Sequence, residues 1–382
     1  MNYLKNEFPS GKLERAVEKI TVITDRNIVK FQNRFPYECT VKGRYPFAVA
    51  LDNNGWIRWT NGFWGGIVWL LYEIRRDAAT RYFGQKLTHF INEMLNKKIF
   101  SYSDIGFFTI PCCISDFRET QNSAARETIV TAADSLLVKY DPHLGFICSD
   151  EKELAQDLLT CNTSNLLNTQ LLFHAYTFTK NTEYIDIAKK NIEKIVKDNI
   201  PDNGISCFRS YYNRKTGEKL DPEKSSMFFN NGRIISPRSC AWALYGLAVR
   251  YSCTKEQSYA DRFDAVFNYL VSKKIEDKLY TTFFCGKNIF PDSTSSAIIV
   301  AALTEMLKNN EMRKDKYKNE CIRLLNLLVD KNSCDPSTNN EGLIKNGFLY
   351  TVSKESCSTI LGDYFYFETL VNILTDRQSV WY

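Results

Sequence analysis

Helical periodicity recurs along almost the whole chain, and it limits the folds that these 382 residues can adopt. Apolar residues spaced by three and four positions mark amphipathic stretches, which are separated by short connectors of Gly, Asn, Asp and Lys. The sequence predicts an all-α protein whose twelve helices span residues 11–33, 63–76, 79–96, 105–117, 121–139, 161–178, 182–198, 238–252, 257–273, 294–308, 313–331 and 361–375.

Several of these predicted helices begin in the same way, with a tyrosine in the first turns after a polar connector. The tyrosines are Tyr82, Tyr184, Tyr259 and Tyr317. Similar turns at intervals of several tens of residues indicate a repeated helix pair, although an irregular helical bundle is the alternative. Six helical hairpins predict an (α/α)6 barrel, in which the loops that enter the inner helices lie at one end. No Pro- or Ser-rich linker divides the sequence, so residues 1–382 are predicted to form a single domain.

The charge and residue composition disfavour several classes of function. The 49 basic and 44 acidic residues give a net charge of only +5, interspersed along helical faces, whereas nucleic-acid binding usually needs a basic stripe. The three histidines are not at metal-ligand spacing, which disfavours a zinc site and Ser-His-Asp chemistry. The sequence also lacks a phosphate-binding glycine loop, so we expect no metal, no cofactor and no nucleic-acid partner.

The sequence also bears on the location of the protein. No run approaches the roughly 18 consecutive apolar residues of a membrane span. The first residues lack the charged region and long apolar run of a signal peptide. The twelve cysteines contain no Cys-x-x-Cys pair. We therefore expect a cytoplasmic protein with reduced thiols and no membrane partner.

Three short segments of unusual composition lie where connectors enter predicted helices. Residues 58–69 contain three tryptophans and three glycines, and residues 103–108 read Ser-Asp-Ile-Gly-Phe-Phe. Residues 238–242 read Arg-Ser-Cys-Ala-Trp. Tryptophan faces beside flexible backbone suit the C–H faces of sugar rings, although tryptophans that only fill the core are the alternative.

All three segments resemble the unsaturated glucuronyl hydrolases, glycoside hydrolase family 88. Segments 292–297 and 362–368 and the final Trp381-Tyr382 are also similar, so the resemblance covers nearly everything from about residue 15 onward. It implies an (α/α)6 barrel that acts on an anionic or uronic-acid-containing oligosaccharide. In this family, an acid protonates C4 of a 4,5-unsaturated uronic acid, water adds at C5, and the hemiketal opens and releases the rest of the substrate.

The resemblance supplies one catalytic carboxylate and shows that another is missing. Asp104 matches one of the two essential acidic residues of the family, and a helix N-cap is the alternative interpretation. The proton-transferring aspartate precedes a Leu-Leu-Asn run, and the matching residue here is Ser164. A serine hydroxyl is not an acid near neutral pH. Asp157, Asp292 and Asp363 are candidates to replace the missing acid, with capping as the alternative for the last two.

The resemblance also implies residues that bind the substrate. Trp59 and Trp242 are expected to stack on a sugar ring, and Arg238 is expected to hold an anionic group. The alternative for Arg238 is an ion pair with a nearby carboxylate.

Other substrate-binding positions differ from the family. Ser103 stands where the family has a histidine, Cys240 replaces a glutamine, and a further family histidine falls near Phe208. These differences leave three hypotheses open. The chain is a hydrolase of this type with a displaced acid, a catalytically impaired or inactive carbohydrate-binding homologue, or a helical scaffold that contacts another protein.

Overall fold

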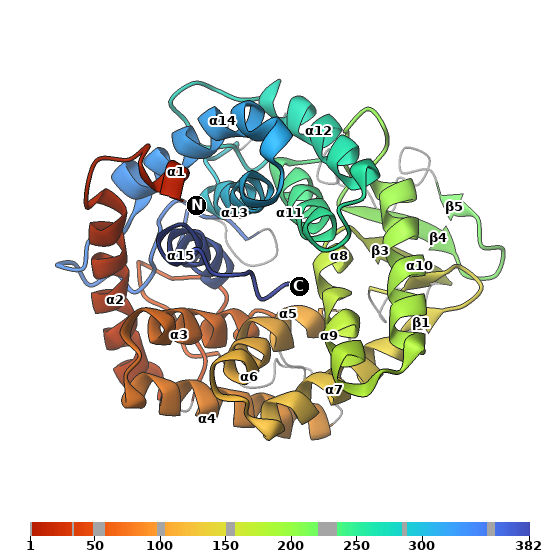
Figure 1. The fold of residues 1–382 in the computed structure, drawn as a ribbon, viewed down its shortest axis with the longest axis horizontal. Coiled ribbons are helices and arrows are strands. Elements are labelled where there is room, and N and C mark those ends of the chain that lie inside the picture. The colour runs from red at the N-terminus through yellow and green to blue at the C-terminus, as the bar shows by residue number, and fades with distance from the viewer. Residues whose placement is uncertain are drawn as a thin grey trace.

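The computed structural model describes residues 2–32, 34–48, 58–97, 104–149, 157–220, 235–284, 289–349 and 356–382. Helices within these ranges form two concentric rings (Figure 1). The inner ring contains α3 (Asn61–Arg75), α5 (Ile105–Thr109), α6 (Ser115–Thr120), α8 (Asn165–Asn168), α9 (Gln170–Thr179), α11 (Pro237–Thr254), α13 (Ser293–Asn309) and α15 (Ile360–Thr375). The outer ring contains α2 (Lys12–Phe31), α4 (Ala78–Asn96), α7 (Ser123–Leu137), α10 (Thr182–Asn199), α12 (Gln257–Val271) and α14 (Lys314–Asn326).

Shorter helical segments complete this arrangement. The π-helix Ile110–Ile114 joins α5 to α6, so that these segments together act as one inner helix. The 3-10 turn Glu311–Arg313 precedes α14, and a second π-helix, Leu327–Asn332, continues it. The short α1 (Asn2–Lys5) lies before the first outer helix. The predicted (α/α)6 barrel is therefore confirmed.

The inner and outer helices differ in how much of their surface is covered. Every residue from Pro237 to Tyr251 on α11 and from Ser293 to Leu307 on α13 is buried. The outer helices α2 and α10 bury only one stripe of residues. A helix that is buried on all sides needs apolar or small residues around its whole circumference, and this explains the composition of the inner ring.

Glycines allow neighbouring inner helices to approach closely. A β-carbon on Gly62 of α3 would lie 2.2 Å from the carbonyl oxygen of Phe107 on α5. A β-carbon on Gly246 of α11 would lie 2.4 Å from Cβ of Leu166 on α8. Further packing of α11 on α13, α13 on α15, and α15 on α3 closes the ring.

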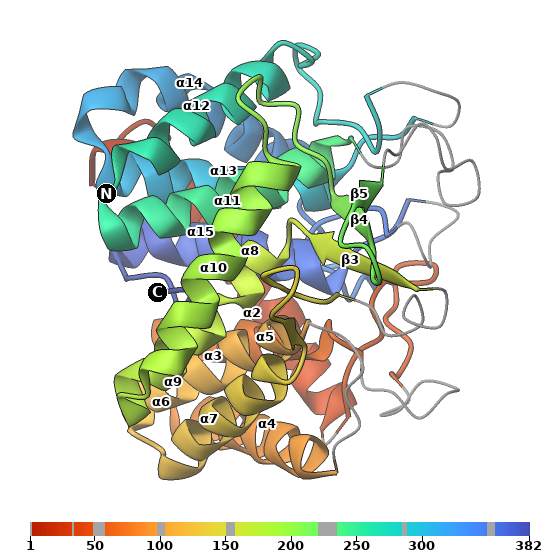
Figure 2. The ribbon, with the colours of Figure 1, turned by 90° about the vertical axis from the view of Figure 1, so that its right-hand side faces the viewer.

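Small sheets mark one end of the barrel. Strands β3 (Leu158–Asn162), β4 (Arg209–Asn213) and β5 (Lys219–Leu220) are antiparallel, and Asn162 lies opposite Arg209. They lie to the right in Figure 2, whereas both chain ends lie to the left. A separate hairpin pairs β1 (Tyr140–Asp141) with β2 (Phe146–Ile147).

The predicted helix 161–178 is wrong at its start. Residues 161 and 162 belong to β3, and the helix begins at Asn165. The reason is a partner distant in the sequence, because β4 pairs with β3 and the Thr163 amide donates to the Phe208 carbonyl at 2.8 Å. Tertiary pairing thus overrides the local periodicity.

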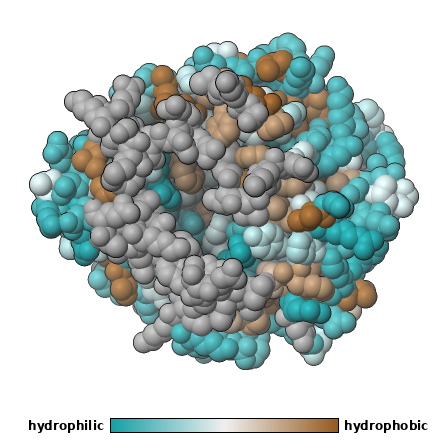
Figure 3. Space-filling model, turned by 180° about the vertical axis from the view of Figure 1, so that it is seen from behind, coloured by the Kyte–Doolittle hydropathy of each residue, from teal (hydrophilic) through white to brown (hydrophobic). Residues whose placement is uncertain are grey.

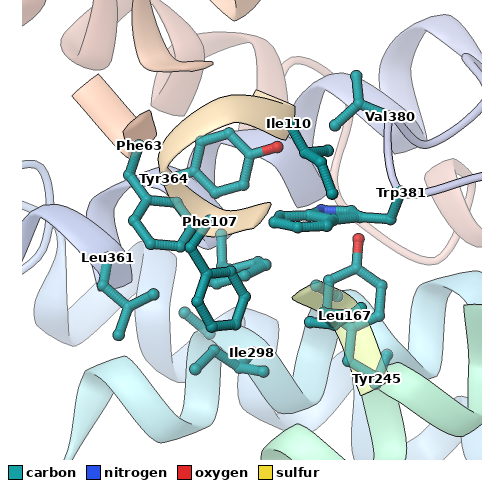
Figure 4. Packing of buried hydrophobic residues seen from close by; sticks show 14 of the residues in the cluster. Phe63, Phe107, Ile110, Leu167, Tyr245, Ile298, Leu361, Tyr364, Val380 and Trp381 are labelled. Atoms are coloured by element: carbon teal, nitrogen blue, oxygen red, sulfur yellow. The ribbon is translucent and has the colours of Figure 1, made fainter. Parts of the chain in front are cut away.

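The C-terminal residues fill the centre of the inner ring. Trp381 is fully buried among Phe107, Tyr245 and Tyr364, with ring centroids 5.8, 6.4 and 6.4 Å away (Figure 4). The Arg118 guanidinium donates to the backbone carbonyls of Ser379 and Tyr382 and so holds this tail in place. Among the helices of the described residues, none combines the length and hydropathy that a bilayer crossing requires.

Candidate active site

The candidate site lies at the end of the barrel that carries β3 and β4. The face seen from this end is hollowed near its centre (Figure 3). Several inner helices meet here, because Phe107 of α5 contacts Trp59 ahead of α3, Trp242 of α11 and Asn168 of α8. The barrel thereby brings together segments that are far apart in the sequence.

Asp104 immediately precedes α5 and is partly exposed. It occupies the N-cap position, but its side chain makes no capping hydrogen bond, so the capping alternative is wrong. Its Oδ1 instead accepts a hydrogen bond from Nδ2 of Asn168 at 3.0 Å. The carboxyl group is therefore held by a neighbouring inner helix.

Asn168 is a site residue that the sequence analysis missed. It is buried, and its Oδ1 accepts a hydrogen bond from the Phe107 amide at 2.8 Å. This contact requires glycine at position 106, because a β-carbon there would lie 2.6 Å from both Cα and the carbonyl oxygen of Asn168. The available signal was that Asn168 ends the Leu-Leu-Asn run.

The aromatic residues of the site cluster around Phe107. Its ring centroid lies 5.6 Å from that of Trp59 and 5.0 Å from that of Trp242. Trp59 is half-buried, whereas Trp242 is only 3% exposed. The structure thus brings both predicted tryptophans together, and their role as sugar platforms stays a prediction.

Arg238 is buried and makes an ion pair. Its guanidinium donates to Oδ2 of Asp292 and to the carbonyl of Phe348, each at 2.7 Å, and to the hydroxyl of Ser295 at 2.8 Å. The alternative of pairing with a nearby carboxylate is confirmed. The role of Arg238 in holding an anionic group of a substrate stays a prediction.

Ser164 lies close along the chain to Asn168, the partner of Asp104. It lies one helical turn before Asn168, whose amide donates to the Ser164 carbonyl at 3.3 Å. Ser164 is buried, and Phe208 is half-buried immediately before β4. Ser103, the other predicted substrate contact, lies outside the described residues.

No protein-family model matches the chain. The unsaturated chondroitin disaccharide hydrolase of Streptococcus pneumoniae is 28% identical over 380 residues, which cover 96% of this chain and 93% of that protein. The crystal structure of the unsaturated glucuronyl hydrolase from Streptococcus agalactiae has a TM-score of 0.87 and 26% identity, over 98% of this chain and 94% of that chain. This chain resembles the unsaturated glucuronyl hydrolases over nearly its whole length. The Bacillus sp. unsaturated glucuronyl hydrolase is also similar, with 24% identity over 97% of this chain and 98% of that protein.

Two buried aspartates of this glucuronyl hydrolase-like chain have structural partners. Asp292 is buried and accepts hydrogen bonds from the Thr294 amide and from Arg238, so the prediction that it caps its helix is confirmed. Asp363 accepts from the Tyr45 hydroxyl at 2.8 Å and from the Ile344 amide at 3.0 Å. Burial raises the pKa of Asp363 to about 7.

Asp157, the third candidate acid, is exposed. Its carboxylate pairs with Nζ of Lys215 at 2.6 Å. Asp157 immediately precedes β3 and Asn162 is its last residue. The two residues are therefore about 16 Å apart along the extended strand. Among the described residues, no group of three or more His, Cys, Asp or Glu side chains is arranged to hold a metal ion.

Proposed function

We propose that this protein hydrolyses glycosides of 4,5-unsaturated uronic acids by hydrating the vinyl ether, with Asp104 as the proton-transferring carboxyl group. The observation that carries this proposal is the placement of Asp104, which is partly exposed, is held by the buried Asn168 and lies three residues before Phe107, the ring that contacts Trp59 and Trp242. The relatives support the substrate class, because a solved mutant of the Streptococcus agalactiae enzyme is complexed with dGlcA-GalNAc6S.

A single carboxyl group suffices for this reaction. The protonated Asp104 gives its proton to C4, and positive charge develops at C5 and the ring oxygen. The resulting carboxylate then accepts a proton from a water molecule, whose oxygen adds to C5. This second transfer restores the protonated Asp104, and the hemiketal at C5 then opens and releases the rest of the substrate.

The second candidate function is carbohydrate binding without turnover. It is favoured by Ser164, which stands where the family has its proton-transferring aspartate. It is also favoured by the three alternative acids, because Asp157, Asp292 and Asp363 all have partners of their own. Such a homologue would keep the aromatic site and lose the chemistry.

The test is the loss of ultraviolet absorbance of unsaturated uronyl disaccharides, measured together with binding by calorimetry. We expect decay that disappears in Asp104→Asn, and faster decay in Ser164→Asp. Decay that persists in Asp104→Asn would remove Asp104 from the mechanism. Binding without decay would establish the second candidate, and the absence of both would overturn the sugar-directed function.

We also propose that the protein works in the cytoplasm on an anionic oligosaccharide. The eleven cysteines of the described residues are all free thiols, and this supports a reducing compartment. Measuring the protein by cell fractionation tests the location, and recovery outside the cytoplasmic fraction would contradict it.

A further inference from the structure

We propose that Asn168 is the positioning residue of Asp104, and that a buried polar network from β2–β4 holds Asn168 in place. This inference rests on the proposed function only in taking Asp104 as the reacting carboxyl group. The contacts themselves are hydrogen bonds between described residues.

The orientation of the Asn168 amide is determined by its neighbours. The Phe107 backbone amide can only donate, so the atom that it contacts at 2.8 Å must be the Asn168 oxygen. The two hydrogens on Nδ2 then point to Oδ1 of Asp104 at 3.0 Å and Oδ1 of Asn165 at 3.3 Å. Asn168 therefore presents a hydrogen-bond donor to Asp104, and it cannot turn without leaving a buried amide hydrogen unpaired.

Asn165 anchors this arrangement from the other side. Its Nδ2 donates to the Ser149 hydroxyl at 3.1 Å and to the Ile147 carbonyl at 3.3 Å. The same Ser149 oxygen accepts the Asn162 amide at 3.0 Å. All of these polar side chains are at most 5% exposed. Because buried polar groups lose free energy when they are unpaired, the network has little freedom to rearrange.

The network extends to a charged residue on β4. Nε of Arg209 donates to Oδ1 of Asn162 at 2.7 Å, opposite it in the strand register. Asn162 in turn donates its backbone amide to Ser149, which also accepts from Asn165. Through Asn165 and Asn168, the hydrogen bonds continue from β4 to Asp104. Asp104 lies 64 residues before Asn168 in the sequence. Its position beside Asn168 therefore depends on the packing of α5 against α8.

An isosteric substitution separates positioning from a general structural role. Asn168→Asp keeps the acceptor for the Phe107 amide and replaces the donor with a carboxylate oxygen about 3 Å from Asp104. Two carboxylates at that distance do not both ionise easily, so the pair must retain a proton to higher pH. Asn168→Ser removes the donor without adding a charge, and its effect is expected to be smaller.

Asn191 provides a matched control. It is also a buried asparagine, whose Oδ1 accepts the Ile147 amide at 2.8 Å and whose Nδ2 donates to the Thr169 hydroxyl at 2.6 Å. Asn191→Asp therefore makes the same chemical change on α10, where the two hydrogen-bond partners are a backbone amide and a hydroxyl.

The experiment follows the titration of Asp104 by carboxyl ¹³C NMR in the full chain, with the resonance assigned by its loss in Asp104→Asn. We expect Asn168→Asp to move the midpoint upward by one pH unit or more, Asn168→Ser to move it by less, and Asn191→Asp to leave it unchanged. An unchanged midpoint in both Asn168 variants would overturn the proposal, and Asn168→Ser decides it if the aspartate variant does not fold. The titration needs no turnover, so a wild-type protein without hydrolase activity would refute the proposed function and still test the positioning.

Discussion

Replacing Gly106 with alanine tests whether the Asp104 site depends on the close approach of α5 and α8. The added β-carbon would lie 2.6 Å from Cα and the carbonyl oxygen of Asn168. Favourable contacts between heavy atoms begin near about 3.4 Å, so the two segments must separate by roughly 0.8 Å. The hydrogen bond from the Phe107 amide to Asn168, now 2.8 Å long, would then stretch to about 3.6 Å and be lost.

The expected loss of stability follows from these contacts. Overpacking costs about 1–3 kcal/mol, and a buried amide without its acceptor costs about 1–3 kcal/mol more. The better helix propensity of alanine offsets about 1 kcal/mol. The free energy of unfolding is therefore expected to fall by about 1–5 kcal/mol in urea denaturation, and sugar binding or turnover is expected to fall at least about tenfold because Asn168 no longer reaches Asp104.

Gly66→Ala is the matched control for crowding. Its β-carbon would lie 2.4 Å from the Tyr364 ring and 2.7 Å from Cβ of Pro111, within the inner ring but against side chains that do not hold Asp104. We expect this variant to lose stability and to keep its affinity for the sugar. A Gly106→Ala protein that unfolds and binds like the wild type would refute the reasoning.

Three further predictions concern the buried interior. Arg238→Met leaves the Asp292 carboxylate buried without its ion-pair partner and is expected to lower the free energy of unfolding by about 3–5 kcal/mol. Adding Asp292→Asn is expected to recover part of this loss. Urea denaturation of the wild type, the two single variants and the double variant measures both effects. Trp381→Ala is expected to cost about 3–5 kcal/mol in the same assay, because the fully buried indole fills the centre of the ring, and an unchanged midpoint would show that the tail does not support the barrel. Burial raises the pKa of Glu368 from its usual 4.5 to about 7, so the folded protein binds this proton more tightly and stability falls as the pH rises through that window. Glu368→Gln should flatten the stability–pH profile there by up to about 1.4 kcal/mol per pH unit, and an identical slope in both proteins would contradict the shift.

Features that depend on neighbouring residues in the sequence were predicted well. Helical periodicity located the twelve helices. The capping role of Asp292 is also local, because its carboxylate accepts a hydrogen bond from the backbone amide of Thr294, two residues later. The last two residues of β3 were taken for helix because the local sequence does not reveal the partner strand β4, which lies more than forty residues later. Local patterns do not contain such pairings.

In the candidate site, too, local features were predicted and contacts between distant segments were not. Asp104 was found because the residues beside it form a recognisable motif. Asn168 was missed because its role arises only where it meets Asp104, 64 residues away in the sequence. Gly106 belongs to the motif, but the sequence does not show why a glycine is needed there. The structure shows that the Asn168 backbone packs against this position.

The tail that carries Trp381 also affects the order in which the protein can fold during synthesis. All the helices of the two rings lie before residue 376, so a nascent chain can have every helix and still lack the side chain that lies among Phe107, Tyr245 and Tyr364. An unfilled apolar cavity destabilises a core in proportion to its volume. The barrel therefore reaches its final packing only after the ribosome has added these residues, and until then apolar surface that Trp381 covers stays unpacked.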